Sequence, residues 1–320
     1  MSFQDLLPPG ETLPSGGLLG AARLVLPETP PGEGSPSAWR ATARQFLRSR
    51  TGMAGLVIIV IMVLFSFIGP LIYPTNQVAT NILQLNLPPS SRFPLGTDAV
   101  GYNELGRLMA GGQPSLEVGI AAAAIAAIIG TVWGAAAGYV GGWVDAVMMR
   151  IVDGFVAIPT VLIVLLLASI VTPSVGTLII VLGCVSWLIT ARLVRGEVLV
   201  LRTLDYVLAA RMAGERPIRI VFRHLIRNVV GTVAVQATFE VANAILLLAA
   251  LSFLGLGPPP PAANWGSMLT AGLEYIFDGY WWQVYPAGLC IVLTVVAFNL
   301  LGDSVRDLLE VRLQQQRGSS

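Results

Sequence analysis

"MAGLVIIVIMVLFSFIGPLIY" (residues 53–73) contains 21 residues and no charged side chain. The hydrocarbon core of a bilayer is about 30 Å thick, and a helix needs roughly 20 apolar residues to cross it. The whole chain shares this character, because 55% of its 320 residues are hydrophobic and 12% are charged. Soluble domains carry about 25% charged residues. The sequence therefore predicts a membrane protein and excludes a soluble globular domain.

Five further apolar segments follow the first. Together they predict an all-α membrane protein with six transmembrane helices, at about residues 53–73, 115–139, 147–171, 175–194, 229–254 and 284–302. The second segment is rich in glycine and alanine, as in "GIAAAAIAAIIGTVWGAAAGYVGG", and small residues let membrane helices pack closely. Cys184 and Cys290 both lie in apolar segments and are predicted to be packed free thiols.

The arginines are distributed unevenly along the chain, which has no lysine. Seventeen of nineteen precede the first segment, follow the second, lie between the fourth and fifth, or follow the last. Cytoplasmic loops of membrane proteins carry an excess of Lys and Arg. Both termini and the loop at residues 195–228 are therefore predicted to be cytoplasmic. Arg92 and Arg107 are predicted to lie outside.

The spans divide the chain into four parts. Residues 1–49 form a Pro- and Gly-rich cytoplasmic tail that is predicted to be disordered. Its last part, residues 38–50, is basic and predicts a helix on the membrane surface or a charge cluster that only sets topology. Residues 50–112 hold the first transmembrane helix and an extracytoplasmic segment. Residues 113–313 form a core of five transmembrane helices, and residues 314–320 form a C-terminal tail.

The cytoplasmic loop has more structure than topology alone requires. Its sequence from residue 205 is "DYVLAARMAGERPIRIVFRHLIRN". The spacing predicts a helix that ends at Gly214 and a second helix that starts at Pro217. The second helix is predicted to carry one apolar and one basic face, formed by Ile218, Val221, Phe222 and Leu225 and by Arg219, Arg223 and Arg227 respectively. Such a helix fits either the membrane surface or a groove of a partner protein.

A few polar residues interrupt the apolar segments. Glu240 lies near the middle of the fifth, with Gln236 and Asn243 on the same predicted helix face. Buried carboxylates in membrane helices face protein or water. This stripe is interpreted either as part of a translocation path or as hydrogen bonding between helices. Asp153 is predicted to pair with Arg150.

Several kinds of chemistry are excluded or disfavoured. A phosphate-binding P-loop needs a lysine, and the chain has none. One histidine and two separated cysteines predict neither a structural metal site nor a haem site. An enzyme is disfavoured because no nucleophile–base pair is visible. A nucleic-acid-binding protein is disfavoured because the arginines adjoin membrane spans. An ion-coupled secondary transporter remains the alternative from a different class.

The loop resembles the "EAA" loop of binding-protein-dependent ABC importer permeases, which reads E-A-A-x3-G and then I-x-L-P. Ala209, Ala210 and Gly214 match, whereas Leu208 stands at the glutamate and Arg227 at the proline. The fuller pattern is similar to that of the second, C-type subunit of dipeptide/oligopeptide permeases. Agreement continues in "FPLGTDAVG" (93–101), although Tyr102 and Asn103 replace the usual Arg-Asp, in "ALSFLGLGPPPPAANWGSML" (250–269) and in "PAGLCIVLTVVAFNLLGDSVRDLLEVR" (286–312).

The resemblance implies a type I ABC importer permease in the bacterial cell membrane. It implies a short coupling helix that docks on a cytoplasmic ATPase, with the contact residues Tyr206, Ala209, Ala210, Arg211, Gly214, Arg219, Arg223 and His224. ATP and Mg would be bound by the partner ATPases, and this chain would be a non-catalytic subunit without cofactor or metal. The implied partners are a homologous B-type permease, two ATPase domains, an external substrate-binding protein and membrane lipid. The implied cargo is a dipeptide or oligopeptide; nickel complexes, haem or glutathione are the alternatives within the family.

Overall fold

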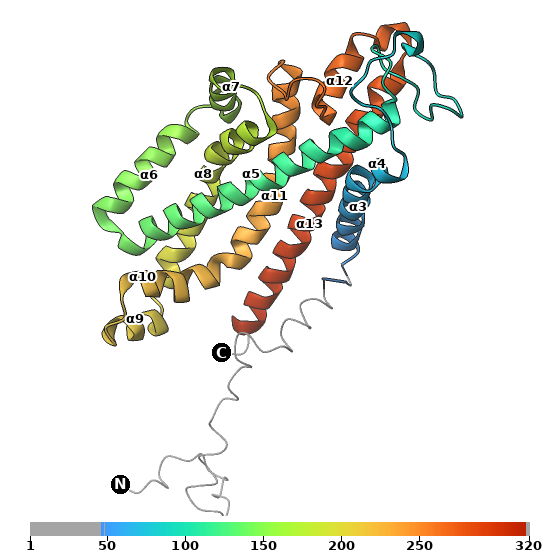
Figure 1. Cartoon of the computed structure of the whole chain (residues 1–320). Helices are drawn as coiled ribbons and strands as arrows, with labels where there is room; N and C mark the ends of the chain where they lie inside the picture. The colour runs from blue at the N-terminus through green and yellow to red at the C-terminus, as the bar shows by residue number, and fades with distance from the viewer. Residues whose placement is uncertain (1–45, 48, 318–320) are drawn as a thin grey trace, which may run out of the picture. The chain divides into compact units, whose positions relative to one another are not determined.

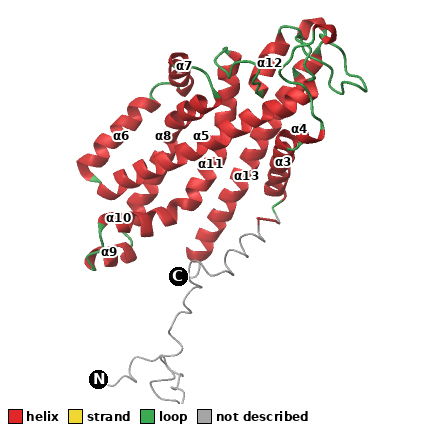
Figure 2. Ribbon diagram, viewed as in Figure 1, coloured by secondary structure: helices red, strands yellow, loops and turns green. Residues whose placement is uncertain are grey.

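The computed structural model describes residues 46–47 and 49–317, the side chains only as far as residue 309. This part of the chain is helical and forms no strand (Figures 1 and 2). The principal helices are α3 (Arg50–Phe67), α4 (Gly69–Ile72), α5 (Glu104–Val140), α6 (Gly142–Val156), α7 (Thr160–Ile170), α8 (Val175–Leu201), α9 (Asp205–Met212), α10 (Pro217–Ile220), α11 (Ile226–Phe253), α12 (Trp265–Leu273) and α13 (Tyr285–Arg317). The predicted basic helix at 38–50 and the rest of the tail 1–49 lie almost wholly outside the described residues.

Among the described residues, five helices are long and apolar enough to cross a membrane, and α6 with α7 supply a sixth span if they are counted as one. The all-α fold with six spans is confirmed in this form. The uninterrupted span predicted at 147–171 is wrong, because α6 and α7 are bent by 83° at a short break. Pro159 lies at this break, before the first residue of α7. Proline removes a backbone donor and disfavours helix in the residue before it.

Several helices extend beyond the predicted spans. α5 begins at Glu104 and continues through Pro114, so part of the predicted outer segment belongs to the helix. α8 continues to Leu201, so residues 195–201 are helix rather than loop. The extension carries Arg195, whose Nε and Nη2 donate to the two carboxylate oxygens of Asp145 in α6 at 2.5 and 2.7 Å. α13 reaches Arg317, so the start of the predicted C-terminal tail is helical too.

Close packing of α5 against α8 organises the centre of the molecule. Three glycines at intervals of four residues, Gly130, Gly134 and Gly138, face α8. A Cβ atom at Gly130 would lie 2.8 Å from the Trp187 carbonyl oxygen, and one at Gly138 would lie 3.0 Å from the Arg195 carbonyl oxygen. The backbones approach this closely only because side chains are missing, which confirms the predicted role of the small residues.

The opposite end of α5 is held by α12. Trp265 is fully buried, and its indole Nε1 donates to the Leu108 carbonyl oxygen at 2.9 Å. The Trp265 backbone N–H donates to Ser115 Oγ at 3.2 Å. The segment before α5 joins the same end, because Trp282 Nε1 donates to the Thr97 carbonyl oxygen at 3.2 Å. Segments far apart in the sequence thus form one packed end.

Two local predictions need correction. Asp153 pairs with Arg192 at 2.5 Å and not with Arg150, because α8 lies beside α6 and presents its arginine to the carboxylate. Cys290 is buried as expected, but Cys184 is exposed. An apolar segment predicts membrane insertion and does not tell which of its side chains face protein and which face lipid.

Candidate functional site

α9 forms an elbow between two long helices. It ends at Met212, Ala213 is its C-cap residue, and Gly214 follows with φ +75°. The Glu215 N–H donates to the Ala210 carbonyl oxygen at 3.1 Å and the Gly214 N–H to the Arg211 carbonyl oxygen at 3.0 Å. This pair of bonds is the Schellman ending, which needs a left-handed residue. The predicted end at Gly214 and the restart at Pro217 are both confirmed.

α9 is fixed firmly to the spanning helices. Val207 is fully buried and packs in a cluster with Val198, Ile220, Leu225 and Val229, from α8 and the start of the fifth spanning helix. The Arg202 guanidinium donates to the Gly138 carbonyl oxygen at 2.9 Å, at the carboxyl end of α5. A cation at that end complements the helix dipole. α9 is therefore packed against α8 and the start of the fifth spanning helix, and the turn before it is bonded to the carboxyl end of α5.

Two of the predicted contact residues strengthen this attachment. The Arg211 guanidinium lies over the Tyr139 ring, 4.8 Å from its centroid. Tyr206 lies beside His224 with ring centroids 6.2 Å apart, and its hydroxyl accepts from Asn228 Nδ2 at 2.9 Å. These side chains hold the elbow in place.

Glu215 links two more of the predicted residues. Its carboxylate contacts Arg219 Nε at 3.1 Å and His224 Nε2 at 3.0 Å. Arg216 and Arg223 are exposed and form no ion pair among the described residues. Sequence reasoning missed Glu215, although a single carboxylate within an arginine-rich stretch was the available signal. Glu215 therefore pairs with Arg219 and bonds His224 within the chain, while Arg216 and Arg223 keep their charge unpaired among the described residues.

The apolar face predicted for residues 218–225 is wrong in part. Ile220 and Leu225 are buried, whereas Ile218 and Phe222 are 73% and 62% exposed. Residues 221–225 form a π-helical turn, in which the Ile226 N–H bonds to the Val221 carbonyl oxygen. This turn adds a residue to the repeat and shifts the side chains around the axis. Two large apolar side chains therefore face outward.

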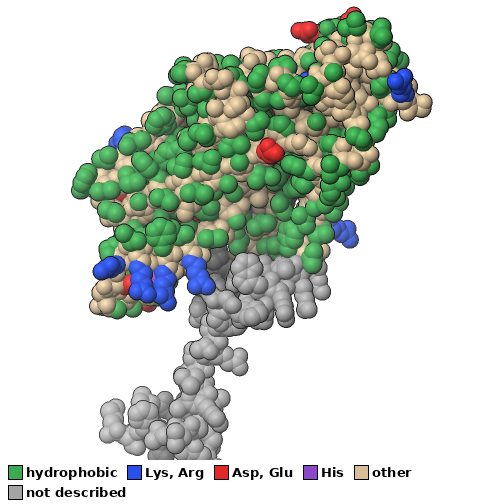
Figure 3. Space-filling view, viewed as in Figure 1, with side chains coloured by type: hydrophobic (Ala, Val, Ile, Leu, Met, Phe, Trp, Pro, Cys, Tyr) green, Lys and Arg blue, Asp and Glu red, His purple; other side chains and the backbone are tan. Residues whose placement is uncertain are grey.

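An open groove runs between α9 and the helix that follows it. It is lined by Ala210, Ala213, Gly214, Glu215, Arg216, Arg219, Arg223 and His224. Arginine side chains gather at this end of the molecule (Figure 3). Beside the groove, Met212 is 84% exposed and Leu208 is 41% exposed. Ala209 is exposed too, while Ala210 packs partly against the buried cluster. The surface thus combines small, apolar and cationic groups. Across the described residues, no three His, Cys, Asp or Glu side chains come close enough to hold a metal ion.

The polar residues of α11 do not share one environment. Glu240 is buried within the chain, and its Oε1 accepts from Gln236 Nε2 at 3.1 Å. Asn243 is exposed. The shared face predicted from helical spacing is therefore divided, because the neighbouring helices cover one side of α11 and leave the other open.

Comparison with known proteins identifies similar chains. Residues 130–315 match the family model described as binding-protein-dependent transport system inner membrane component. Residues 37–89 match the N-terminal TM domain of oligopeptide transport permease C. The chain is 39% identical over 278 residues to the dipeptide transport system permease protein DppC of Bacillus subtilis, covering 87% of this chain and 86% of the relative.

Two oligopeptide relatives are nearly as similar. The oligopeptide transport system permease protein OppC of Bacillus subtilis is 37% identical over 281 residues, covering 88% of this chain and 92% of the relative. The protein of the same name from Haemophilus influenzae is 37% identical over 276 residues, covering 86% and 88%. The similarity extends over the elbow as well as the spanning helices.

Proposed function

The chain belongs to the family of binding-protein-dependent transport system inner membrane components, and we propose on this premise that it is the permease subunit of an ATP-driven peptide importer. The relatives named above are dipeptide and oligopeptide permeases. The cargo is a dipeptide or oligopeptide that an external binding protein delivers. An ion-coupled secondary transporter is not favoured, since membership of this family implies a binding protein and a separate motor.

The observation that carries the mechanism is the attachment of α9. Its buried Val207 ties it to the spanning helices, while Met212 on the same helix is almost fully exposed. An apolar side chain with this exposure, at an arginine-rich end, suits a groove on a partner protein. α9 is therefore the coupling helix, and closure of the ATPases moves α5, α8 and α11 through it.

The predicted contact residues divide the work. Ala209, Ala210 and Gly214 keep the surface small enough for close approach. Arg223, together with Arg216, meets acidic groups of the ATPase or lipid head groups. Tyr206, Arg211, Arg219 and His224 set the shape of the elbow through the contacts described above. ATP and Mg bind to the partner ATPases, so this chain contributes movement rather than catalysis.

The orientation follows from the arginines. Figure 1 places the start of α3, the end of α13 and α9 toward one end of the molecule. An excess of arginine there makes this end cytoplasmic. Residues 74–103 and the α12 end then face outward, toward the binding protein. Residues 50–112, which hold α3 and the outer segment, form one part, and residues 113–313 form the permease core.

Half of the path belongs to a second, B-type permease. Asn243 is exposed on α11 and lines the path, while Gln236 and Glu240 support it from within the chain through their hydrogen bond. A polar side chain on the open side of a spanning helix fits a water-filled cavity better than lipid.

Uptake in proteoliposomes tests the function. The chain is reconstituted with its B-type partner and ATPases, and import of a labelled tripeptide is measured. We expect uptake only with both ATP inside and binding protein outside. An ATPase variant without its phosphate-binding lysine is the control and should give none. Uptake that follows an imposed ion gradient without ATP would contradict the proposal.

A further inference from the structure

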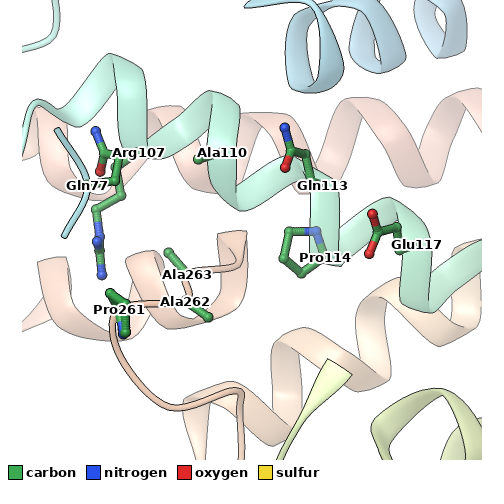
Figure 4. Close-up of a pocket in the computed structure, with 9 residues that line it drawn as sticks. All are labelled: Gln77, Arg107, Ala110, Gln113, Pro114, Glu117, Pro261, Ala262 and Ala263. Atoms are coloured by element: carbon green, nitrogen blue, oxygen red, sulfur yellow. The ribbon is translucent and has the colours of Figure 1, made fainter. Parts of the chain in front are cut away.

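A cavity of about 230 Å³ lies at the end of the molecule opposite α9. One wall is α5, which contributes Arg107, Gln113 and Glu117, and the facing wall is the segment 261–263 before α12 (Figure 4). Gln77 closes one end. The proposed orientation places this cavity on the outer side of the membrane, where cargo arrives. It is separate from the elbow and from the α11 residues.

Arg107 has donor capacity that the chain leaves unused. Its side chain is 15% exposed, and its Nε lies 3.7 Å from Asp98 Oδ2. Its guanidinium lies over the Tyr102 ring at 4.5 Å. Nη1, however, is buried without a hydrogen-bond partner, and so is Gln77 Oε1. Nη1 itself is closed to solvent, but the Arg107 side chain lines the cavity and is partly exposed, so it can offer an N–H to an acceptor there. The side chain extends across the cavity toward Pro261 (Figure 4).

Glu117 supplies the opposite charge. It is exposed on α5 and makes no ion pair or hydrogen bond with the described residues. A carboxylate on a spanning helix avoids lipid and faces water or protein. It is the only carboxylate inside the second apolar segment, residues 115–139.

The spacing of the two charges defines a ligand. Arg107 and Glu117 are ten residues apart on one helix, which separates their Cα atoms by about 15 Å. An extended peptide spans about 3.5 Å per residue. A chain of three or four residues therefore reaches between the two side chains with a carboxylate at one end and an ammonium group at the other.

We propose that this cavity is an outer acceptor site for short peptides with free termini, in which Arg107 binds the C-terminal carboxylate and Glu117 the N-terminal ammonium group. Gln77 and Gln113 hydrogen-bond the peptide backbone. The site rests on the proposed import of peptides and adds a contact in the permease itself to the selection made by the binding protein. The site selects peptides by the charges of their termini and does not select among the side chains of the cargo.

The test measures protection of a cavity residue without requiring transport. Ala262→Cys is introduced into a background lacking Cys184 and Cys290, because Ala262 is exposed and lines the cavity. The assembled complex without binding protein is labelled with an impermeant maleimide in the presence of tetra-alanine. Tetra-alanine should slow labelling, and its N-acetylated and C-amidated forms should need about tenfold higher concentrations because each lacks one charge-assisted bond.

Two variants test which side chain binds which terminus of the peptide. Glu117→Gln should remove the difference between the free and N-acetylated peptides, and Arg107→Gln the difference between the free and amidated ones. Glu274→Gln, an exposed carboxylate after α12, should change neither, and labelling at Phe277→Cys should ignore all three peptides. If Arg107→Gln does not assemble, Glu117→Gln still decides the ammonium half.

Two results would overturn the site: no protection by tetra-alanine, or equal protection by all three peptides. Protection by the binding protein alone would show that a protein segment fills the cavity, which also overturns it. Failure of peptide uptake in the proteoliposome assay would instead remove the proposed function, so the two failures are distinguishable.

Discussion

Gly134→Leu is expected to reduce the amount of folded chain in the membrane at least tenfold. A Cβ atom at this position meets the Ala191 carbonyl oxygen and lies 2.9 Å from the Val194 Cβ. The carbonyl belongs to the α8 backbone and cannot move aside without separating the helices. Overpacking of a tight contact costs about 1–3 kcal/mol or more, and leucine adds three further carbons. α8 carries the buried residues that hold α9, so the elbow is lost too.

Alanine makes the comparison sharper. In an open helical position, Gly→Ala stabilises by about 1 kcal/mol because glycine is the weaker helix former. Gly154 in α6 has no atom within 4 Å of its would-be Cβ, so Gly154→Ala should be neutral or stabilising. Gly134→Ala should lower the thermal midpoint of the detergent-purified complex despite the same gain in propensity. Equal midpoints for both variants would show that the α5–α8 contact is looser than described.

Gly214→Val is expected to abolish uptake while leaving abundance and assembly close to wild type. The left-handed conformation costs an L-residue about 1–2 kcal/mol, and a β-branched residue tolerates it least. No atom lies within 4 Å of a Cβ built at Gly214, so the requirement is conformational and not steric. Valine would open the helix ending and displace Glu215 with Arg219 and His224. ATP hydrolysis stimulated by the binding protein should become uncoupled from transport, so that it no longer drives peptide uptake.

Gly214→Asn is the matched control, because asparagine enters the left-handed region more readily than other residues. It should retain most of the uptake, and Gly214→Ala should lie between. The measurement is uptake per assembled complex in proteoliposomes, with abundance determined on the same sample. If valine retained wild-type uptake, the helix ending would have no part in coupling.

Much of the architecture is predictable because the membrane imposes it. Apolar length predicts the six spans, the glycine- and alanine-rich second segment predicts close helix packing without identifying the partner helix, and Gly214 with Pro217 predicts the elbow. Each of these signals is local, because span length, backbone conformation and capping depend on neighbouring residues. Pro159 is a local signal for the 83° bend before α7. The apolar segment around it is long enough for one transmembrane helix, and it therefore predicts a single uninterrupted span.

The remaining features depend on contacts between distant segments. Asp153 pairs with Arg192, which is 39 residues away in the sequence, because α8 lies beside α6. The π turn at 221–225 shifts Phe222 and the residues after it relative to α10, and the sequence carries no recognisable signal for such a turn. Glu117 and Arg107 are recognised as residues of one site only because the segment before α12 lies against α5 and encloses a cavity with it. Sequence periodicity predicts which residues share a face and does not predict what covers that face.

The proposed docking of α9 on a cytoplasmic ATPase can be tested by site-specific cross-linking. A photoreactive amino acid is placed at Met212 in α9 or at Phe277 after α12, which are 84% and 97% exposed; α9 and α12 lie at opposite ends in Figure 1. After illumination of cells expressing the full transporter, Met212 should cross-link to the ATPase, and Phe277 should not. A Met212 product with lipid or the external binding protein alone, or an ATPase product from Phe277, would contradict the account.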